Sequence, residues 1–428
     1  MGKTDSKMDK TQQTSFGHKT CTIVGAGVGG LAAAAALSPI FGEIVILEKD
    51  GLPNSPESRK SVPQSAHLHS LLIGGSNLLE QIFPGIMQEV VTAGGCKLRA
   101  GIDQQVYEFG NWMPVRDLGV DIFAQSRPLL EYVMRQKVLS LPNVKFLEHT
   151  RATQLDLDSS GKITALRISG MDAKTHSVNT DMVVDASGLS GKLIHQLISL
   201  IPAIEEKKEI VQSNIVYVSA IVKKPREWID HHENILVIAE PAQSAGGALI
   251  DIEGNRWCVS LHGRNGLEPP SDFAEWKLFA KQLPADRIWD RVKNCELMGK
   301  LAIFKKPVSY LRRFDLIANL PGNYFPLGDT ISSVNPTFGQ GMTLALGHAQ
   351  FLKNHLLSDP DSSHAEYIQQ AVNFSYKAWR RTVAYDSMFL PDEKKINVMR
   401  SLALAKHQQA VNDAQKHKEF LNQAQMLS

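Results

Sequence analysis

The chain has 428 residues, of which 43% are hydrophobic, so it can hold two or three domains or one large α/β body with an inserted sheet. The net charge of +2 gives no electrostatic case for a nucleic-acid partner. Cys21, Cys96, Cys258 and Cys295 form no CxxC pair, which argues against a zinc or iron–sulfur site and favours a reducing, cytoplasmic compartment.

The first 19 residues are polar, and they are predicted to form a disordered tail without a secretory signal. Gly2 followed by Ser6 fits the short N-myristoylation pattern, and acylation of Gly2 stays open. No apolar run approaches the roughly 18 residues of a membrane span. We therefore expect no stable membrane insertion, since one acyl chain alone binds membranes only marginally.

Residues 22–48 are predicted to form a strand, a glycine turn, a helix and a second strand. The turn, Gly25-Ala26-Gly27-Val28-Gly29-Gly30, is a full GxGxxG. In a dinucleotide site the first glycine makes the tight turn, the second lets the backbone approach a pyrophosphate, and the third lets the helix pack on its strand. Glu48 lies at the offset where a carboxylate holds a ribose hydroxyl. The alternative is a glycine-rich turn without a ligand.

Two arginines are candidates for contact with an anion. Arg59 lies in the loop 49–66, over the predicted ligand-binding edge of the sheet, and either meets a phosphate or is a solvated loop charge. Arg127 follows the predicted cap Ser126 at the start of a helix, where a cation opposes the helix dipole. A nearby anion would explain this position, and a surface arginine is the alternative. For His67 and His69 a capping or structural role is favoured.

The rest of the chain alternates between strand and helix signals. A hairpin is predicted around residues 158–161, a buried strand at 182–185, and a second, antiparallel sheet from strands at 210–222, 234–239, 248–252, 257–261 and 304–311. Helices are predicted at 68–83, at 271–282 with Ser271 as its cap, at 339–357, at 362–391 and at 395–425. The predicted fold is α/β: a Rossmann-like domain at 20–208 and 314–358, with part of the second sheet near 96–125, an inserted antiparallel sheet domain at 209–313, and a C-terminal helical region at 359–428.

Three motifs in this order resemble the FAD-dependent monooxygenase superfamily with the fold of p-hydroxybenzoate hydroxylase, a glutathione-reductase-type flavoprotein fold. They are the GxGxxG with Glu48, then Val183-Val184-Asp185-Ala186-Ser187-Gly188, then Leu327-Gly328-Asp329-Thr330. The stretches Val62-Pro63-Gln64, Arg127-Pro128-Leu129-Leu130-Glu131 and Asn335-Pro336-Thr337-Phe338-Gly339-Gln340-Gly341-Met342 look like those of a hydroxylase and epoxidase branch of natural-product pathways.

The resemblance implies roles for individual residues. Glu48 would bind the adenosine ribose, Asp329 a ribityl hydroxyl of FAD, and Arg127 the pyrophosphate or ribityl region. Pro336 would lie by the flavin ring, and the helix that starts at 339–342 would point at its pyrimidine end. The full predicted cofactor set is Gly25, Gly27, Val28, Gly29, Gly30, Glu48, Lys49, Arg59, Arg127, Gly188, Gly328, Asp329, Pro336, Gly339, Gly341 and Met342.

The function implied is that of a monooxygenase that hydroxylates or epoxidises an apolar unsaturated or aromatic small molecule through a flavin C4a-hydroperoxide. Molecular oxygen is the co-substrate. There is no second GxGxxG, and hence no separate nicotinamide domain. The Asp-Gly pair that family members often carry for their nicotinamide cofactor is not identified, so the donor stays open: NADPH or NADH, either directly or through a partner flavin reductase. Two rivals stay open: an FAD-dependent reductase or dehydrogenase acting on C=C bonds, and a non-catalytic flavoprotein or lipid chaperone.

Halogenation is disfavoured, since Asn111-Trp112-Met113-Pro114 does not match the Trp-x-Trp-x-Ile-Pro stretch of flavin halogenases. No catalytic residue is assigned. His262 and Tyr310 lie on predicted strands of the second sheet, and a structural role is favoured for both.

Overall fold

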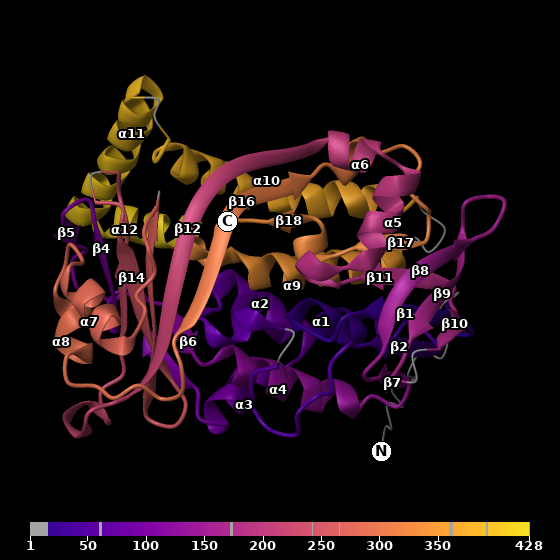
Figure 1. Ribbon diagram of the computed structural model, residues 1–428, viewed down its shortest axis with the longest axis horizontal. Coiled ribbons are helices and arrows are strands. Elements are labelled where there is room, and N and C mark those ends of the chain that lie inside the picture. The colour runs from indigo at the N-terminus through magenta and orange to yellow at the C-terminus, as the bar shows by residue number, and fades with distance from the viewer. Residues whose placement is uncertain are drawn as a thin grey trace, which may run out of the picture.

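The computed structural model describes residues 16–59, 62–171, 174–241, 243–264, 266–358, 363–390 and 393–427. Its strands gather in two main regions: a parallel sheet near the N-terminus and a larger, mostly antiparallel sheet at the other end, with helices α1, α2 and α9 running between them (Figure 1). Gly2 and most of the predicted tail lie outside the described residues. Phe16, by contrast, is buried against Phe41, so the last residues of that tail pack on the body.

The parallel sheet confirms the predicted strand–turn–helix–strand unit. Its five strands have the order β17-β11-β1-β2-β7, and every pair is parallel. Apolar runs buried on both faces are typical of such sheets, which helices cover on each side. The strands are β1 (Thr20–Val24), β2 (Glu43–Leu47), β7 (Val144–Leu147), β11 (Met182–Asp185) and β17 (Tyr324–Pro326). The helices α1 (Val28–Leu37) and α4 (Arg127–Leu139) pack on these strands, and α9 (Gln340–Ser358) packs on α1.

A three-stranded antiparallel sheet lies beside the parallel one. The predicted hairpin is confirmed, because the Asp158 carboxylate accepts hydrogen bonds from the backbone N–H groups of Ser160 and Lys162 and closes the turn. The sequence prediction missed the third strand. The strands are β8 (Arg151–Leu157), β9 (Ile163–Ser169) and β10 (Thr175–Asn179), and α5 (Lys192–Leu200) packs on β8.

The large sheet has the order β18-β16-β12-β15-β14-β13-β4-β5. Its strands are β4 (Gln104–Glu108), β5 (Asn111–Trp112), β12 (Lys208–Lys223), β13 (Asn234–Val237), β14 (Gly246–Ile252), β15 (Arg256–Arg264), β16 (Ala302–Arg312) and β18 (Ser332–Ser333). All pairs are antiparallel except β4 with β13. Of the segment near 96–125, only β4 and β5 join this sheet, while β3 (Cys96–Arg99) and β6 (Asp121–Ala124) form a ribbon of their own.

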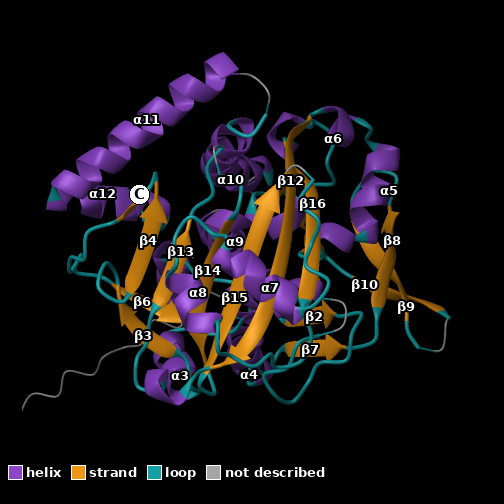
Figure 2. Cartoon of the chain, turned by 60° about the vertical axis from the view of Figure 1, so that its left-hand side comes forward, coloured by secondary structure: helices purple, strands orange, loops and turns teal. Residues whose placement is uncertain are grey.

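The two faces of the large sheet differ. Along β15, Val259 and Leu261 pack in a hydrophobic core with Trp276 of α7 (Phe273–Lys281) and Ile288 of α8 (Arg287–Val292). Figure 2 shows α7 and α8 lying in front of this sheet. Alternate residues of a strand point to opposite faces, so the residues between them point inward. The predicted cap of α7 is wrong by one residue: the Asp272 carboxylate accepts the Glu275 N–H, while Ser271 donates to the Glu275 carboxylate.

The remaining helices complete the body. Residues 68–72 have no regular secondary structure, and Leu72 is extended, so the helix predicted from residue 68 begins later, as α2 (Ile73–Ile82). Helix α3 (Ile86–Thr92) follows. The helix predicted at 395–425 is broken at Asp413, whose carboxylate caps the second piece. The other helices are α6 (Ala203–Glu206), α10 (Ala365–Ser387), α11 (Glu393–Asn412), α12 (Ala414–Ala424), and the short 3₁₀ turns η1 (Pro63–Ala66), η2 (Gly188–Ser190), η3 (Arg226–Trp228), η4 (Phe314–Leu316), η5 (Gly328–Thr330) and η6 (Pro336–Phe338).

None of the helices in the described ranges combines the length and the apolar character that a membrane span requires.

Candidate functional site

One cavity of about 730 Å³ runs from the glycine turn after β1 to the inner face of the large sheet. It is lined by all the predicted cofactor residues except Gly30: Gly25, Gly27, Val28, Gly29, Glu48, Lys49, Arg59, Arg127, Gly188, Gly328, Asp329, Pro336, Gly339, Gly341 and Met342. These residues come from seven separate runs of the chain between residues 25 and 342. Residues from motifs that are far apart in the sequence therefore line one cavity.

The glycine turn has the geometry that the sequence predicted. Gly25 has a φ of +104°, and a Cβ there would lie 2.7 Å from the carbonyl oxygen of Ala186. A Cβ on Gly30 would lie 1.8 Å from the carbonyl oxygen of Gly25, so Gly30 serves the packing of α1 on the turn. At Gly27 the nearest atom to a Cβ would be Arg59 Nη2, 3.9 Å away. The turn thus leaves open backbone facing the cavity, as the approach of a phosphate requires.

Four charged side chains form a buried row beside this turn. Glu48 Oε2 accepts hydrogen bonds from the Ala26 N–H at 2.9 Å and from Arg59 Nη1 at 2.8 Å. Arg59 Nη2 lies 2.9 Å from Glu131 Oε2, and Arg127 Nε lies 2.8 Å from Glu131 Oε1. Burial alone would raise the pKa of the Glu131 carboxyl, but Arg127 and Arg59 outweigh it and hold that pKa below its usual range.

Glu131 was missed as a site residue by the sequence reasoning. It pairs with Arg127 four residues earlier on the same helix, and that spacing was the available signal. The predicted contact of Arg127 with the FAD pyrophosphate or ribityl region stays a prediction. Arg59 is not the solvated loop charge of the alternative prediction, because its side chain is 3% exposed between two carboxylates.

Asp329 lies on η5 and lines the same cavity. Among the described residues, its carboxylate has no hydrogen-bond or ion-pair partner, although it lines the cavity. Burial raises its pKa, and Lys306, Arg127 and Arg312 oppose that rise. A carboxylate that lines the cavity and has no protein partner can accept a hydrogen bond from a ligand hydroxyl.

The N-terminus of α9 also faces the cavity. Gly339, with a φ of +64°, Gln340 and Gly341 line it there, and a Cβ on Gly341 would meet nothing within 4 Å. Gln340 Oε1 is buried without a partner in the described chain. The first turn of a helix carries free N–H groups and favours negative charge on a ligand.

The far end of the cavity is lined by the inner face of the large sheet. Tyr217, Ala248, Ser260, His262, Phe304 and Lys306 line this wall. His262 lies beside Tyr217, with ring centroids 5.5 Å apart, and its Nε2 is buried without a partner in the described chain. Burial, assisted by Arg264, lowers the pKa of His262 to about 3, so the ring is neutral. Tyr310 does not line the cavity, and its hydroxyl donates to the Asp329 carbonyl.

The C-terminal helices close this end, which the sequence reasoning missed. Arg381 of α10 and several residues of α12 or just after it line the cavity: His417, Phe420, Leu421, Ala424 and Gln425. Arg116 fixes the turn before α12 by donating to the carbonyls of Ala410 and Val411. The amphipathic pattern of α12 predicts a buried face but does not say what that face covers.

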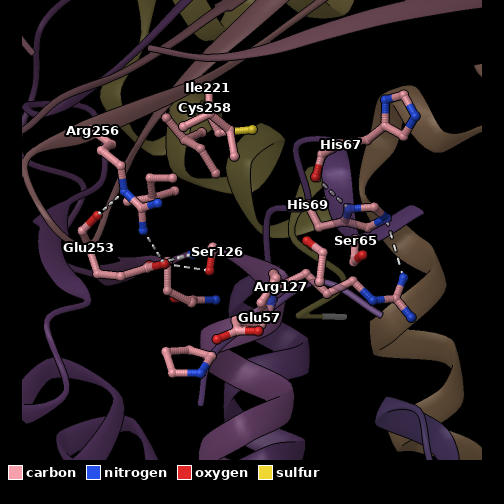
Figure 3. Close-up of a pocket in the computed structure, with 16 residues that line it drawn as sticks. Glu57, Ser65, His67, His69, Ser126, Arg127, Ile221, Glu253, Arg256 and Cys258 are labelled. Carbon is pink, nitrogen blue, oxygen red and sulfur yellow. Dashed lines mark hydrogen bonds and ion pairs between the residues drawn. The ribbon is translucent and has the colours of Figure 1, made fainter. Parts of the chain in front are cut away.

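A smaller cavity of about 230 Å³ adjoins the large one and is shown in Figure 3. His67, His69 and Arg127 line both cavities and form the wall between them. Arg127 Nη1 lies 3.4 Å from His69 Nε2, and His67 Nδ1 lies 2.8 Å from Ser219 Oγ. On the far side the Glu253 carboxylate accepts from Ser126 and Arg256, which ties the start of α4 to the β14–β15 hairpin (Figure 3).

Outside the two cavities, Cys96, His232 and Asp251 form a cluster whose ligand atoms lie within 4.8 Å of one another. The sequence, which shows no CxxC pair, gave no sign of it. The Asp251 carboxylate already holds Lys224 Nζ at 3.0 Å, with both side chains 1% exposed. Its charge is thereby neutralised within the protein.

Comparisons with known proteins agree with this geometry. Residues 18–360 match the family model described as "FAD binding domain". Protein Rv3254 of Mycobacterium tuberculosis is 29% identical over 394 residues, which cover 86% of this chain and 80% of that protein. Among solved structures, p-nitrophenol 4-monooxygenase PnpA from Pseudomonas putida DLL-E4 superposes with a TM-score of 0.67 at 14% identity, covering 96% of this chain and 98% of that one. The flavin-dependent brominase Bmp2 gives a TM-score of 0.69 at 14% identity, covering 95% and 93%.

Proposed function

The chain belongs to the FAD-binding family with the p-hydroxybenzoate-hydroxylase-like fold, and on that premise we propose that it is a monooxygenase that hydroxylates or epoxidises a small organic molecule. The observation that carries the proposal is the single cavity that joins the glycine turn, the N-terminus of α9 and the inner face of the large sheet. A cofactor held at one end of such a cavity can reach a substrate held at the other.

The residues present fit FAD. The open backbone at Gly27 would receive the pyrophosphate, Glu48 the adenosine ribose, and the unpartnered Asp329 carboxylate a ribityl hydroxyl. The N-terminus of α9 would stabilise negative charge on the flavin pyrimidine ring. When bound and reduced, FAD supplies the oxygen-activating chemistry.

The protein's own contribution would be to bind, orient and exclude water. The inner sheet face and α12 enclose the substrate end of the cavity, and Phe304, Pro336, Phe338 and Phe420 give it an apolar lining. A dry pocket protects a reactive oxygen species from side reactions. His262 lines this end and its Nε2 has no partner in the described chain, so we propose that it holds a substrate hydroxyl or carbonyl. Because the ring is neutral, one of its nitrogens donates and the other accepts.

Electrons would come from NADPH or NADH, either directly or through a partner flavin reductase. We propose this because FAD needs a reductant. The described chain contains one GxGxxG turn, at residues 25–30, and no second turn that would mark a separate nicotinamide domain. Adding NADPH, NADH or a generic flavin reductase to the FAD-loaded protein and following flavin bleaching distinguishes the three donors.

Oxygen dependence is the test of the reaction class. With candidate aromatic and unsaturated substrates, ¹⁸O₂ should place one labelled atom in the product, and turnover should stop under nitrogen. Conversion that is equally fast without oxygen would identify the reductase or dehydrogenase instead. Bound FAD that can be neither reduced nor reoxidised would identify a non-catalytic flavoprotein. Turnover that requires bromide or chloride would contradict the proposal in favour of a halogenase.

A further inference from the structure

The substrate end of the large cavity carries two opposite charges that do not pair. Arg381 projects from α10, and Glu108 is the last residue of β4, with α12 lying beside β4 in both views (Figures 1 and 2). Both residues line the cavity. Their neighbours in the lining are mostly apolar: Val106, Met113, Leu236, Ile238, Phe338, Phe420 and Leu421. Charged groups in such surroundings are expected to be paired or to meet a ligand.

Arg381 is held in place by weak contacts that leave most of its donors free. Its guanidinium carbon lies 4.1 Å from the ring centroid of Phe338, and Nη1 lies 3.4 Å from the Ala424 carbonyl oxygen. In the described part of the chain, no carboxylate is within ion-pair distance of Arg381. Burial lowers its pKa, and the nearby Glu108 and Tyr385 oppose that change. A guanidinium has five N–H donors, so four of them have no acceptor among the described residues.

Glu108 does not neutralise this cation. Its carboxyl has no hydrogen bond or ion pair among the described residues, and burial raises its pKa to about 7, with Arg381 opposing the rise and Glu240 adding to it. Glu240 itself is paired with Arg400 of α11. His407 of α11 and His417 of α12 have pKa values lowered by burial, so they bring no positive charge at neutral pH.

We propose that Arg381 binds a carboxylate of the substrate, and that Glu108, in its protonated form, donates a hydrogen bond to the same group. The inference rests on the proposed function and names its substrate class: a small, mainly apolar organic acid. The planar guanidinium fork matches a carboxylate, and Phe338 fixes the plane of that fork. A phosphate dianion fits less well, because its second charge would lie beside Glu108.

The arrangement makes binding depend on pH. An anion bound next to Glu108 favours the protonated form of its carboxyl. If Glu108 is ionised in the free protein, it therefore takes up a proton when the anion binds. Affinity is therefore highest below pH 7 and falls as the pH rises through the pKa of Glu108, which is about 7. Replacing Glu108 by glutamine keeps a donor and removes the titration.

The test is calorimetric titration of the FAD-loaded protein with benzoate, 2-naphthoate and octanoate, each against its primary amide, at pH 6 and pH 8. At least one acid should bind at pH 6 roughly tenfold more tightly than its amide, and more weakly at pH 8. Arg381→Gln should abolish the preference, and Arg381→Lys should retain part of it. Arg380→Gln, which removes the same charge from an exposed neighbour, should leave the preference unchanged. Glu108→Gln should bind the acid equally at both pH values.

Equal binding of acids and amides, no binding by any of the three acids, or an unchanged preference in Arg381→Gln would overturn the inference. Flavin content and oxygen consumption are measured on the same samples. If the protein holds no FAD but the acids bind through Arg381, the monooxygenase proposal fails and this inference stands. If the protein is a functional flavoprotein without any acid preference, only this inference fails.

Discussion

The two ends of the large cavity are built in different ways. The cofactor end comes from continuous motifs: a βαβ turn, the Gly188 turn, η5 and the start of α9, each placed at the edge of one sheet. The substrate end comes from β4, β13, β15, α10 and α12, which are far apart in sequence. At the cofactor end the backbone makes the binding surface, so a short local sequence is enough to determine it. Where side chains from many elements converge, packing over the whole chain decides which ones meet.

The largest expected effect is at the glycine turn. Gly30→Ala places a Cβ 1.8 Å from a backbone oxygen, so the turn and α1 must separate, and we expect a loss of about 3 kcal/mol or more in unfolding free energy. Urea denaturation of the FAD-free protein measures it. Gly341→Ala is the matched control, since its Cβ meets nothing within 4 Å and alanine favours the helix by about 1 kcal/mol. Equal stability of the two variants would contradict the assigned role of Gly30.

The buried row of charges should be nearly as sensitive. Glu131→Gln leaves Arg127 without its carboxylate and Arg59 with Glu48 alone, and breaking a buried pair in this way costs about 3 kcal/mol. The pKa of Glu131 is lowered in the folded state, so its contribution is present above its unfolded pKa and is lost as the pH falls through the folded pKa. The difference in unfolding free energy between wild type and variant should therefore shrink in acid. A difference that stays constant down to acidic pH would argue against this ion-pair network.

Asp329 should behave in the opposite way. Its pKa is raised in the folded state, so it costs stability above its unfolded pKa, and Asp329→Asn should be at least as stable as wild type at pH 7 without FAD. Removal of its charged hydrogen bond in Asp329→Ala should weaken FAD binding by roughly ten- to a hundredfold, about 1.5–3 kcal/mol. Fluorescence titration with FAD measures it. Unchanged affinity would remove Asp329 from the site.

The smallest effect concerns the wall of the substrate end. His262→Phe removes the unpartnered Nε2 of a neutral ring, so neither FAD affinity nor stability should change measurably. Binding of a hydroxyl- or carbonyl-bearing substrate should weaken by about 0.5–1.5 kcal/mol, a few-fold to about tenfold. Steady-state KM with such a substrate reports it. A drop in FAD affinity instead would mean that the two ends of the cavity are not separable.

The contrast also explains how much could be predicted from sequence. The roles of Gly25 and Gly30 follow from backbone sterics, and the structure confirms their geometry. The ion pair of Arg127 with Glu131 emerged only with the fold, and the contact of Arg127 with FAD stays a prediction. Arg381 and Glu108 could not be predicted, because nothing in α10 or β4 alone says that the two face one cavity. The break at Asp413 was missed because cap residues also occur inside long helical stretches.

The central claim is that the glycine turn, Asp329 and the start of α9 together form an FAD site. Titration of the purified, FAD-free protein with FAD, followed by the flavin absorbance spectrum, tests it directly. We predict a shifted, structured bound-flavin spectrum that saturates at one FAD per chain, and heat should release unmodified FAD. A spectrum identical to that of free FAD throughout the titration, with no retention of flavin on gel filtration, would contradict the account.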